Sequence, residues 1–417
     1  LPFQDPDRLV AVWETDRNSG TVREPSAWPD YVDFKSRTRT LARIEAIVGA
    51  DYSLIPEQGE PARVSGVAVT HGYLGMLGIS PLLGRTFSPE EDLPGGPKVA
   101  LLGESLWRTR FGADRGVLGR QVRFNDDLVT IVGVLPRGAD FGIDQLNARA
   151  AYHATYTSEG EIDVWIPIQG SEERYSRHNH PFLLVGRLAR TATVSAANAE
   201  LAGIAAALEQ EHPQSNRARG ARVEPLESVV FGPIRPVLWL LVGTVALVLI
   251  VACVNVASLL LARGTARARE VVVRGALGAS AGRLARQFLT EAVLLAVLGG
   301  AAGAALAYGG LSGLLALAPG DIPRIDEVTI DLRVLVVTLA ISLAVGVGFG
   351  LVPTMQARRL DVTGVIRGES RGASGGVTHR RAREVLVVVE LALSVMLVVG
   401  AVLLVRSFGS VLDVDPG

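Results

Sequence analysis

Four long runs of apolar residues occupy the second half of this 417-residue chain and constrain its fold more than any other feature. A helix needs about 20 apolar residues to cross the roughly 30 Å hydrocarbon core of a bilayer, and each run is that long. Helices in a soluble core rarely run so far without a charge on any face, so buried soluble helices are the weaker interpretation. We expect four membrane-spanning helices, over 237–262, 292–318, 334–357 and 385–405.

The charges between these runs set the expected orientation. The connection over 263–286 has six arginines and one acid, and the connection over 358–384 has seven arginines and three acids. The loop between them, 319–333, has two arginines and four acids. Because cytosolic loops of membrane proteins are enriched in Lys and Arg, we expect both basic connections inside the cell and residues 1–235 outside.

Residues 1–235 have the composition of a soluble, mixed domain. They carry 25 Lys and Arg against 30 Asp and Glu, so they are not basic enough to indicate nucleic-acid binding. Alternating apolar residues predict strands over 8–14, 63–70, 128–136 and 182–189. Helical spacing predicts helices over 26–44 and 194–210, the second with Ser195 as N-cap. We expect an α+β domain whose first and last thirds pack together around a strand-rich insert.

An arginine-rich segment joins the first two apolar runs. Arg263, Arg267, Glu270 and Arg274 are spaced by 4, 3 and 4 residues, so they share one face of a helix. Gly278 can end that helix in a left-handed conformation, and Ser280 can cap the next one. Such a corner fits a cytosolic docking element, although arginines that anchor lipid headgroups would show the same pattern.

The segment over 269–303, REVVVRGALGASAGRLARQFLTEAVLLAVLGGAAG, resembles the signature of FtsX-like ABC permeases, the superfamily that includes the MacB-type exporters. Gly275 departs from the bulkier residue usual in that signature. The residues that carry the resemblance are Arg269, Glu270, Arg274, Ala276, Leu277, Gly278, Ala279, Ser280, Gln287, Phe288, Leu289, Glu291, Gly299, Gly300 and Gly303.

The outer region adds to this resemblance. GYLGMLGISPLLGRTFSPEED (72–92) and the segment 99–136 are similar to the MacB-like periplasmic core domain. The resemblance implies two Porter-like βαβ units with a Sabre-like insert in 1–235, and an FtsX-like, all-α permease domain in 236–368 with its coupling segment at 263–286. Residues 369–383 would be a cytosolic linker, and 384–417 the first membrane helix of a second half. The arrangement is most similar to duplicated permeases of the acidobacterial type, so we expect a fragment of a longer chain.

The resemblance also implies a function. The chain would be a multi-pass inner-membrane permease that transmits ATP-driven motion from a separate cytosolic ABC ATPase to periplasmic domains for export or efflux. Its other partners would be a second permease half or protomer, membrane lipid and a periplasmic adaptor, and the chain itself would hold no cofactor. The alternative is a regulator of the same superfamily that activates a periplasmic enzyme or a signalling partner. The cargo is left open.

Pairs of glycines four residues apart recur within the apolar runs. Small residues at that spacing let membrane helices approach closely, because lipid provides no hydrophobic drive between them. General tolerance of glycine in membrane helices is the competing explanation. The predicted helix-packing residues are Gly299, Gly303, Gly309, Gly313, Gly346 and Gly350.

Catalytic signals are weak. The two lysines, Lys35 and Lys98, follow Phe34 and Pro97, so no Gly-Lys of a phosphate-binding loop occurs in the sequence. Residues 278–282 spell G-x-S-x-G, but an arginine-rich helix is predicted before them where a hydrolase needs a strand. Three histidines, His153, His178 and His180, are a possible metal set, yet histidines in polar loops are more often solvated, so we predict no metal site.

Overall fold

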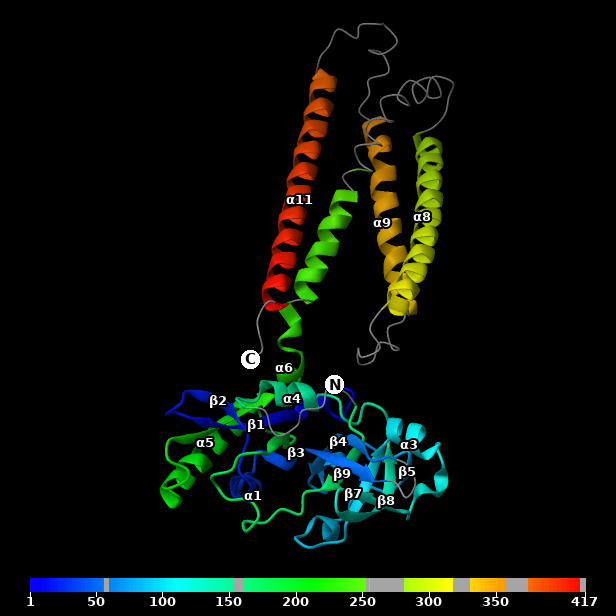
Figure 1. Cartoon of the computed structure of the whole chain (residues 1–417). Coiled ribbons are helices and arrows are strands. Elements are labelled where there is room, and N and C mark those ends of the chain that lie inside the picture. The colour runs from blue at the N-terminus through cyan, green and yellow to red at the C-terminus, as the bar shows by residue number, and fades with distance from the viewer. Residues whose placement is uncertain are drawn as a thin grey trace, which may run out of the picture. The chain divides into compact units, whose positions relative to one another are not determined.

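The computed structural model describes residues 1–55, 60–152, 161–236, 238–252, 255, 281–317, 331–357 and 374–412 (Figure 1). The chain divides into two compact units, Leu1–Pro236 and Val237–Gly417. The division falls where the mixed sequence gives way to the first long apolar run.

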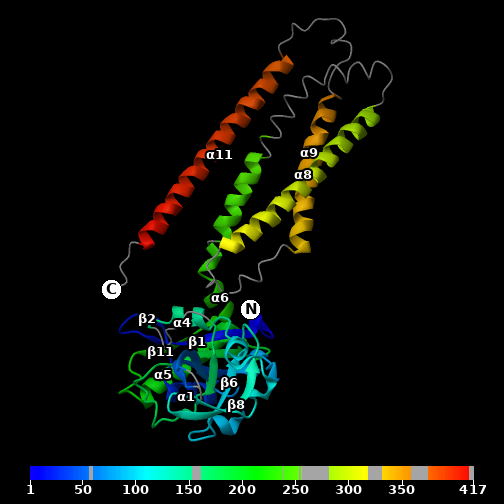
Figure 2. The same cartoon turned by 45° about the vertical axis from the view of Figure 1, so that its right-hand side comes forward.

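One mixed sheet organises the first unit (Figure 2). Its main strand order is β11-β1-β10-β3-β4-β9-β6-β8-β5, with β2 paired to β1, and β7 paired to β3 and β8. The strands are β1 Leu9–Asp16, β2 Thr21–Glu24, β3 Leu41–Ile55, β4 Ala62–Val69, β5 Leu83–Gly84, β6 Val99–Gly103, β7 Gln121–Phe124, β8 Asp127–Leu135, β9 Val164–Pro167, β10 Leu183–Leu188 and β11 Arg219–Pro225.

Two interleaved βαβ units form one half of this sheet. The first is β1, α1 (Trp28–Arg37) and β3, and the second is β10, α5 (Val194–Glu211) and β11. Strand β10 lies between β1 and β3 and runs antiparallel to both, so β1 and β3 point the same way. Strand β1 lies between β10 and β11 and runs antiparallel to both, so β10 and β11 also point the same way. The first and last thirds of the unit therefore pack together, as predicted.

The insert between β3 and β10 extends the same sheet. Its parallel pairs are β4 with β9 and β6 with β8, and the remaining pairs are antiparallel. Short helices connect its strands: α2 Tyr73–Leu77, α3 Glu104–Phe111 and α4 Ile143–Arg149, with 3-10 turns η2 Pro89–Asp92 and η3 Arg115–Val117. The unit also contains η1 Pro6–Arg8 before β1, and α6 Leu226–Phe231 after β11.

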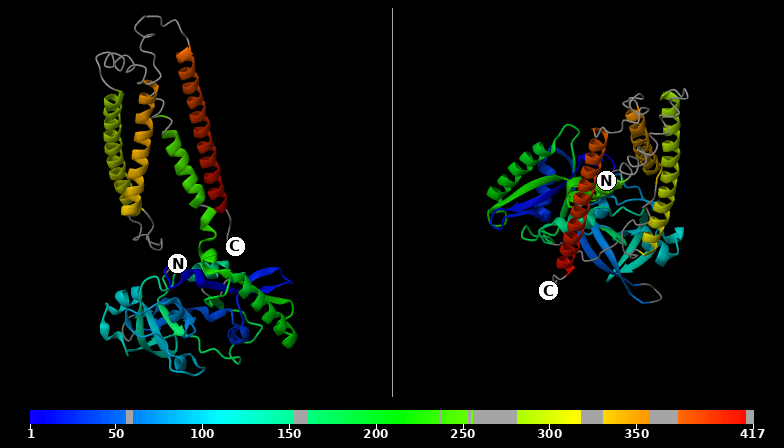
Figure 3. Two further views of the ribbon diagram at one scale, coloured as in Figure 1. Left: turned by 180° about the vertical axis from the view of Figure 1, so that it is seen from behind. Right: turned by 90° about the horizontal axis from the view of Figure 1, so that it is seen from above.

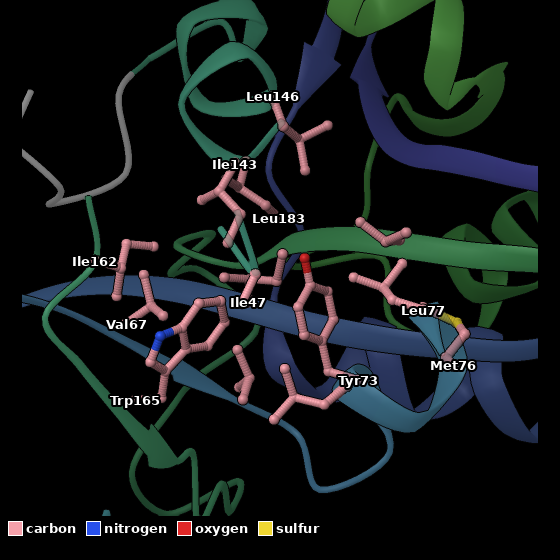
Figure 4. Packing of buried hydrophobic residues seen from close by; sticks show 14 of the residues in the cluster. Ile47, Val67, Tyr73, Met76, Leu77, Ile143, Leu146, Ile162, Trp165 and Leu183 are labelled. Carbon is pink, nitrogen blue, oxygen red and sulfur yellow. The ribbon is translucent and has the colours of Figure 1, made fainter. Parts of the chain in front are cut away.

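Strand alternation divides the core of this unit between the two faces of the sheet. On one face, Trp13 of β1 belongs to a cluster in which the rings of Tyr73 and Trp165 stack with centroids 6.3 Å apart (Figure 4). On the other face, Val12 packs with Phe34 of α1 and Leu201 of α5. Burying each large apolar side chain contributes about 1.5–3 kcal/mol, so these two layers hold the sheet and its helices together.

The second unit consists of helices. They are a helix that reaches Ala252, α8 (Ala281–Leu317), α9 (Leu332–Ala357) and α11 (Ser374–Leu412). Helices α8 and α9 lie side by side (Figure 3). Large apolar side chains are exposed on them, as Leu306 at 77% shows, and such surfaces are typical of lipid-facing helices.

The predicted membrane spans fall on these helices. Among the described residues, Ile234–Ala252 and Leu289–Gly313 are long and apolar enough to cross a membrane. The apolar helical stretches Leu332–Ile341 and Val387–Leu403 are shorter. Four crossings therefore stay a prediction, while the helical, apolar character of the region is confirmed.

Two local predictions were wrong. The helix expected over 26–44 ends at Arg37, and Leu41 to Ile44 already belong to β3. The N-cap of α5 is Thr193, whose hydroxyl accepts a hydrogen bond from the Ala196 backbone N–H, and Ser195 lies inside the helix. Neither error changes the predicted fold class.

Candidate functional site

The predicted coupling residues Arg263, Arg267, Arg269, Glu270, Arg274, Ala276, Leu277, Gly278, Ala279 and Ser280 lie outside the described residues. The described chain resumes at Ala281, where α8 begins. The predicted N-cap role of Ser280 therefore stays a prediction. The conformation predicted around Gly278 stays a prediction.

The next part of the signature lies on the first turns of α8. The Gln287 side-chain amide donates a hydrogen bond to Glu291 Oε1 at 3.4 Å, one helical turn away. The Thr290 hydroxyl donates to the Gln287 backbone carbonyl at 2.8 Å, in the same turn. Together with Arg283 and Arg286, these residues make the start of α8 polar, whereas the rest of the helix is mostly apolar.

The predicted packing glycines lie on two neighbouring helices. Gly299, Gly303, Gly309 and Gly313 are on α8, and Gly346 and Gly350 are on α9. An added Cβ at any of the four α8 glycines would meet no atom of the described residues within 4 Å. The α8 glycine positions thus have room beside them, and their role in packing stays a prediction.

The first residues of the first unit lie beside its last residues. The start of β1 pairs with the end of β11, with Val10 opposite Pro225. Helix α6, which follows β11, contacts η1, which precedes β1 (Figure 2). We call residues 1–8 and 225–231, with Phe141 and α4 beneath them, the terminal junction.

Aromatic and ionic contacts fix the terminal junction. Phe141 lies 6.2 Å from Phe3 and 6.0 Å from Phe231, measured between ring centroids, so one side chain contacts both the first and the last residues of the unit. The Arg187 guanidinium donates to the Gln4 and Met76 backbone carbonyls, each at 2.6 Å. Each aromatic pair contributes about 0.5–1.5 kcal/mol to stability beyond the burial of its apolar area. These contacts therefore hold the first and last residues of the unit against its sheet.

A second polar site lies beneath α1, on the face of the sheet that α1 and α5 cover. Glu14 continues the row of Val10 and Val12 on β1 and is only 2% exposed. Its Oε1 accepts hydrogen bonds from the Ser26 hydroxyl at 2.5 Å and from the Ala27 N–H at 3.0 Å. Its Oε2 lies 3.5 Å from Arg219 Nη1 and 3.3 Å from His180 Nε2.

Asp30 of α1 is the other deeply buried acid at this site, at 1% exposure. Its Oδ1 accepts from Arg177 Nη1 at 2.5 Å and from Asn216 Nδ2 at 2.8 Å, and its Oδ2 has no hydrogen-bond partner among the described residues. Burial, and then the charge of Glu14, raise the pKa of Asp30 to about 6. The site thus holds a carboxyl group that is poised to take up a proton or a cation.

Around these two acids the ion pairs form what we call the buried ionic network. Arg219 pairs with Glu24 at 2.7 Å, and Arg177 reaches Asp33 at 2.6 Å. Arg37 in turn pairs with Asp33 and Glu211. The network joins the arginines Arg177 and Arg219 to the acids Glu14, Glu24, Asp30 and Asp33, so it contains two more carboxylates than guanidinium groups. The exposed Arg37 and Glu211 extend it to the surface and add one charge of each sign.

Among the described residues, the fold does not bring together the histidines that the sequence offered as a possible metal set. His180 is buried at 6% exposure, whereas His178, two residues away, is exposed, and His153 lies outside the described residues. The acids near His180 come from β1 and α1, more than a hundred residues earlier. The available signal was Glu14, a charged residue on the apolar face of a strand.

Comparison with known proteins gives two family matches. Residues 1–204 match the model of the MacB-like periplasmic core domain, and residues 242–362 match that of the FtsX-like permease C-terminal region. The two matches follow each other in the order in which the resemblance was found in the sequence.

Individual relatives agree with these matches. The chain is 27% identical over 366 residues to the macrolide export ATP-binding/permease protein MacB of Chromobacterium violaceum, which covers 85% of this chain and 52% of that protein. It is 24% identical over 318 residues to the uncharacterized ABC transporter permease YknZ of Bacillus subtilis, covering 75% and 72% of the two chains. The chain therefore spans about half the length of MacB.

Among solved structures, the periplasmic region of MacB from Actinobacillus actinomycetemcomitans aligns with 54% of this chain and 91% of its own. The sequence identity is 11% and the TM-score is 0.38.

Proposed function

This chain belongs to the MacB-like and FtsX-like ABC transporter permeases, and on that premise we propose that it transmits ATP-driven motion across the inner membrane for export. A separate cytosolic ATPase would dock on the segment 263–286, and the periplasmic first unit would move in response. Export is the proposed direction because the relative MacB is named for macrolide export. The specific cargo is not part of the proposal.

The order of motifs along the chain carries this proposal. An arginine-rich segment directly precedes α8, and the long apolar helices follow a folded domain that matches the periplasmic core domain. Motion can pass along helices only if they are stiff and closely packed, and α8 and α9 contact each other. Neither lysine of residues 1–417 follows a glycine, so the phosphate-binding loop of the proposed ATPase would lie outside these residues.

The terminal junction supports the same proposal from the other end. Both connections of the first unit lie on neighbouring strands and share the Phe141 contacts. A displacement of this end of the unit would therefore act on paired strands at one edge of the sheet, β11 and β1, rather than on a loose surface loop. The expected tandem arrangement with a second permease half stays a prediction.

Reconstitution with an ABC ATPase from the same gene neighbourhood tests the proposal. We expect the double variant Glu270→Ala and Arg274→Ala to abolish stimulation of ATP hydrolysis while the protein still folds. The matched control is Lys98→Ala with Asp127→Ala, which removes the same two charges from an exposed ion pair of the first unit.

The control should keep wild-type stimulation. Equal stimulation by the wild type and the Glu270 and Arg274 double variant would refute the docking role. Stimulation without any export of cargo would instead favour the regulatory alternative.

A further inference from the structure

The first unit contains three buried ligand atoms that converge without being satisfied by each other. Glu14, Asp30 and His180 each offer one oxygen or nitrogen, and these atoms lie within 4.8 Å of one another. All three residues are more than nine-tenths buried. They come from β1, from α1 and from the segment that leads into β10, so the fold itself brings them together.

Two of these groups have unused lone pairs or protons. His180 Nε2 and Asp30 Oδ2 have no hydrogen-bond partner among the described residues. His180 Nε2 is 3.3 Å from Glu14 Oε2, but the two groups are not aligned for a hydrogen bond. Leaving a buried polar atom unpaired costs about 1–3 kcal/mol, so two such atoms at one point indicate that something binds there.

The charge of the site identifies what would bind. The buried ionic network has two more carboxylates than guanidinium groups. A divalent cation would neutralise that excess. An imidazole with two carboxylates is a ligand set that suits zinc-type ions, whereas calcium and magnesium prefer oxygen ligands alone.

The geometry is close to that of a zinc site. Two ligand atoms at about 2.0–2.1 Å from a tetrahedral zinc ion are about 3.3–3.4 Å apart, and the observed separation of His180 Nε2 and Glu14 Oε2 is 3.3 Å. The other Glu14 oxygen is held by Ser26 and Ala27, which fixes the carboxylate as hydrogen bonds commonly fix metal ligands.

We propose that Glu14, Asp30 and His180 form a structural binding site for a zinc-type divalent metal ion in the periplasmic unit. The ion joins the first βαβ unit, through β1 and α1, to the start of the second at β10. Its role is to fasten the interleaved halves of the sheet, and it takes no part in ATP hydrolysis.

The test uses the full chain, purified in detergent without a polyhistidine tag and stripped with a chelator. We expect one Zn²⁺ per chain on re-addition, a higher unfolding midpoint, and a visible absorption band when Co²⁺ replaces Zn²⁺. His180→Ala should lose all three responses, and the neighbouring exposed His178→Ala should keep them.

Asp30→Asn is the second variant, since it keeps the shape of the side chain and should weaken binding while the protein still folds. The proposal is overturned if the wild type gains no Zn²⁺ or Co²⁺ signal. It is equally overturned if the His178 and His180 variants lose binding alike, or if the midpoint responds to pH and not to metal.

Discussion

The Asp30 carboxyl group gives a pH dependence whose size follows from its surroundings. Burial and the charge of Glu14 raise its pKa from the ordinary 3.8 to about 6. The folded protein then keeps a proton that the unfolded chain has lost. This contribution to stability is fully present below about pH 4 and is lost as the pH rises through about 6. The pKa difference corresponds to about 3 kcal/mol.

The variant Asp30→Asn isolates this effect, because asparagine stays neutral at every pH. Many other carboxyl groups titrate in the same range, so the measured quantity is the difference in unfolding free energy between the variant and the wild type. We expect this difference to grow in favour of the variant by about 2–3 kcal/mol between pH 4 and pH 7.

Urea unfolding of the full chain in detergent, followed by tryptophan fluorescence, provides the measurement. Four of the five tryptophans lie in the first unit, so the signal reports mainly on that unit. A chelator is needed, because a bound metal ion would hold Asp30 ionised. A difference that stays constant within about 0.5 kcal/mol across this pH range would refute the raised pKa and the reasoning from burial.

Two matched pairs of variants test local features of the first unit by the same urea assay. Gly142 and Gly138 both have a positive φ, 86° and 78°, so alanine costs about 1–2 kcal/mol at either. Only at Gly142 would the new Cβ also press on Val230 of α6, at 3.2 Å, so Gly142→Ala should destabilise more than Gly138→Ala, and equal losses would argue against a tight α4–α6 contact. Thr193→Ala should lose about 1 kcal/mol with the α5 cap, whereas Ser195→Ala should change stability by less than about 0.5 kcal/mol; the reverse ranking would contradict the observed cap.

The elements that the sequence predicted correctly are those whose pattern is local. Strands β1, β4, β8 and β10 have apolar residues that alternate or run continuously between turn residues. Helix α5 repeats alanine and leucine at helical spacing. In each case the burial pattern is set by neighbours within a few residues, and these residues are visible in the sequence itself.

The end of α1 was missed because a distant residue decides it. Glu200 of α5 accepts hydrogen bonds from the Arg39 and Thr40 backbone N–H groups at 3.0 and 2.8 Å, and from the Thr38 hydroxyl at 2.8 Å. These bonds take up backbone donors that a continuing helix would have used. The sequence pattern of residues 26–44 does not show that Glu200, about 160 residues away, accepts these hydrogen bonds.

The cluster of Glu14, Asp30 and His180 could not be predicted from the sequence, since its members are far apart along the chain. Glu14 and His180 meet because β10 pairs with β1, and Asp30 joins them because α1 covers that face of the sheet. In the sequence, Glu14 is visible only as a charged residue at a position of β1 where an apolar residue is expected. Such an exception identifies one residue of a site and leaves its partners undetermined.

The topology of the first unit also determines how it can respond to motion of the membrane helices. Strands β1 and β11 are paired over seven residue pairs, from Val10 with Pro225 to Asp16 with Arg219. Sliding β1 along β11 would have to break all the hydrogen bonds between the two strands at once, whereas moving both strands together breaks none of them. Because each backbone hydrogen bond contributes about 0.5–1.5 kcal/mol, common displacement is the softer response. Under the proposed function, the unit should therefore move as a rigid body on its terminal junction, while its sheet stays intact.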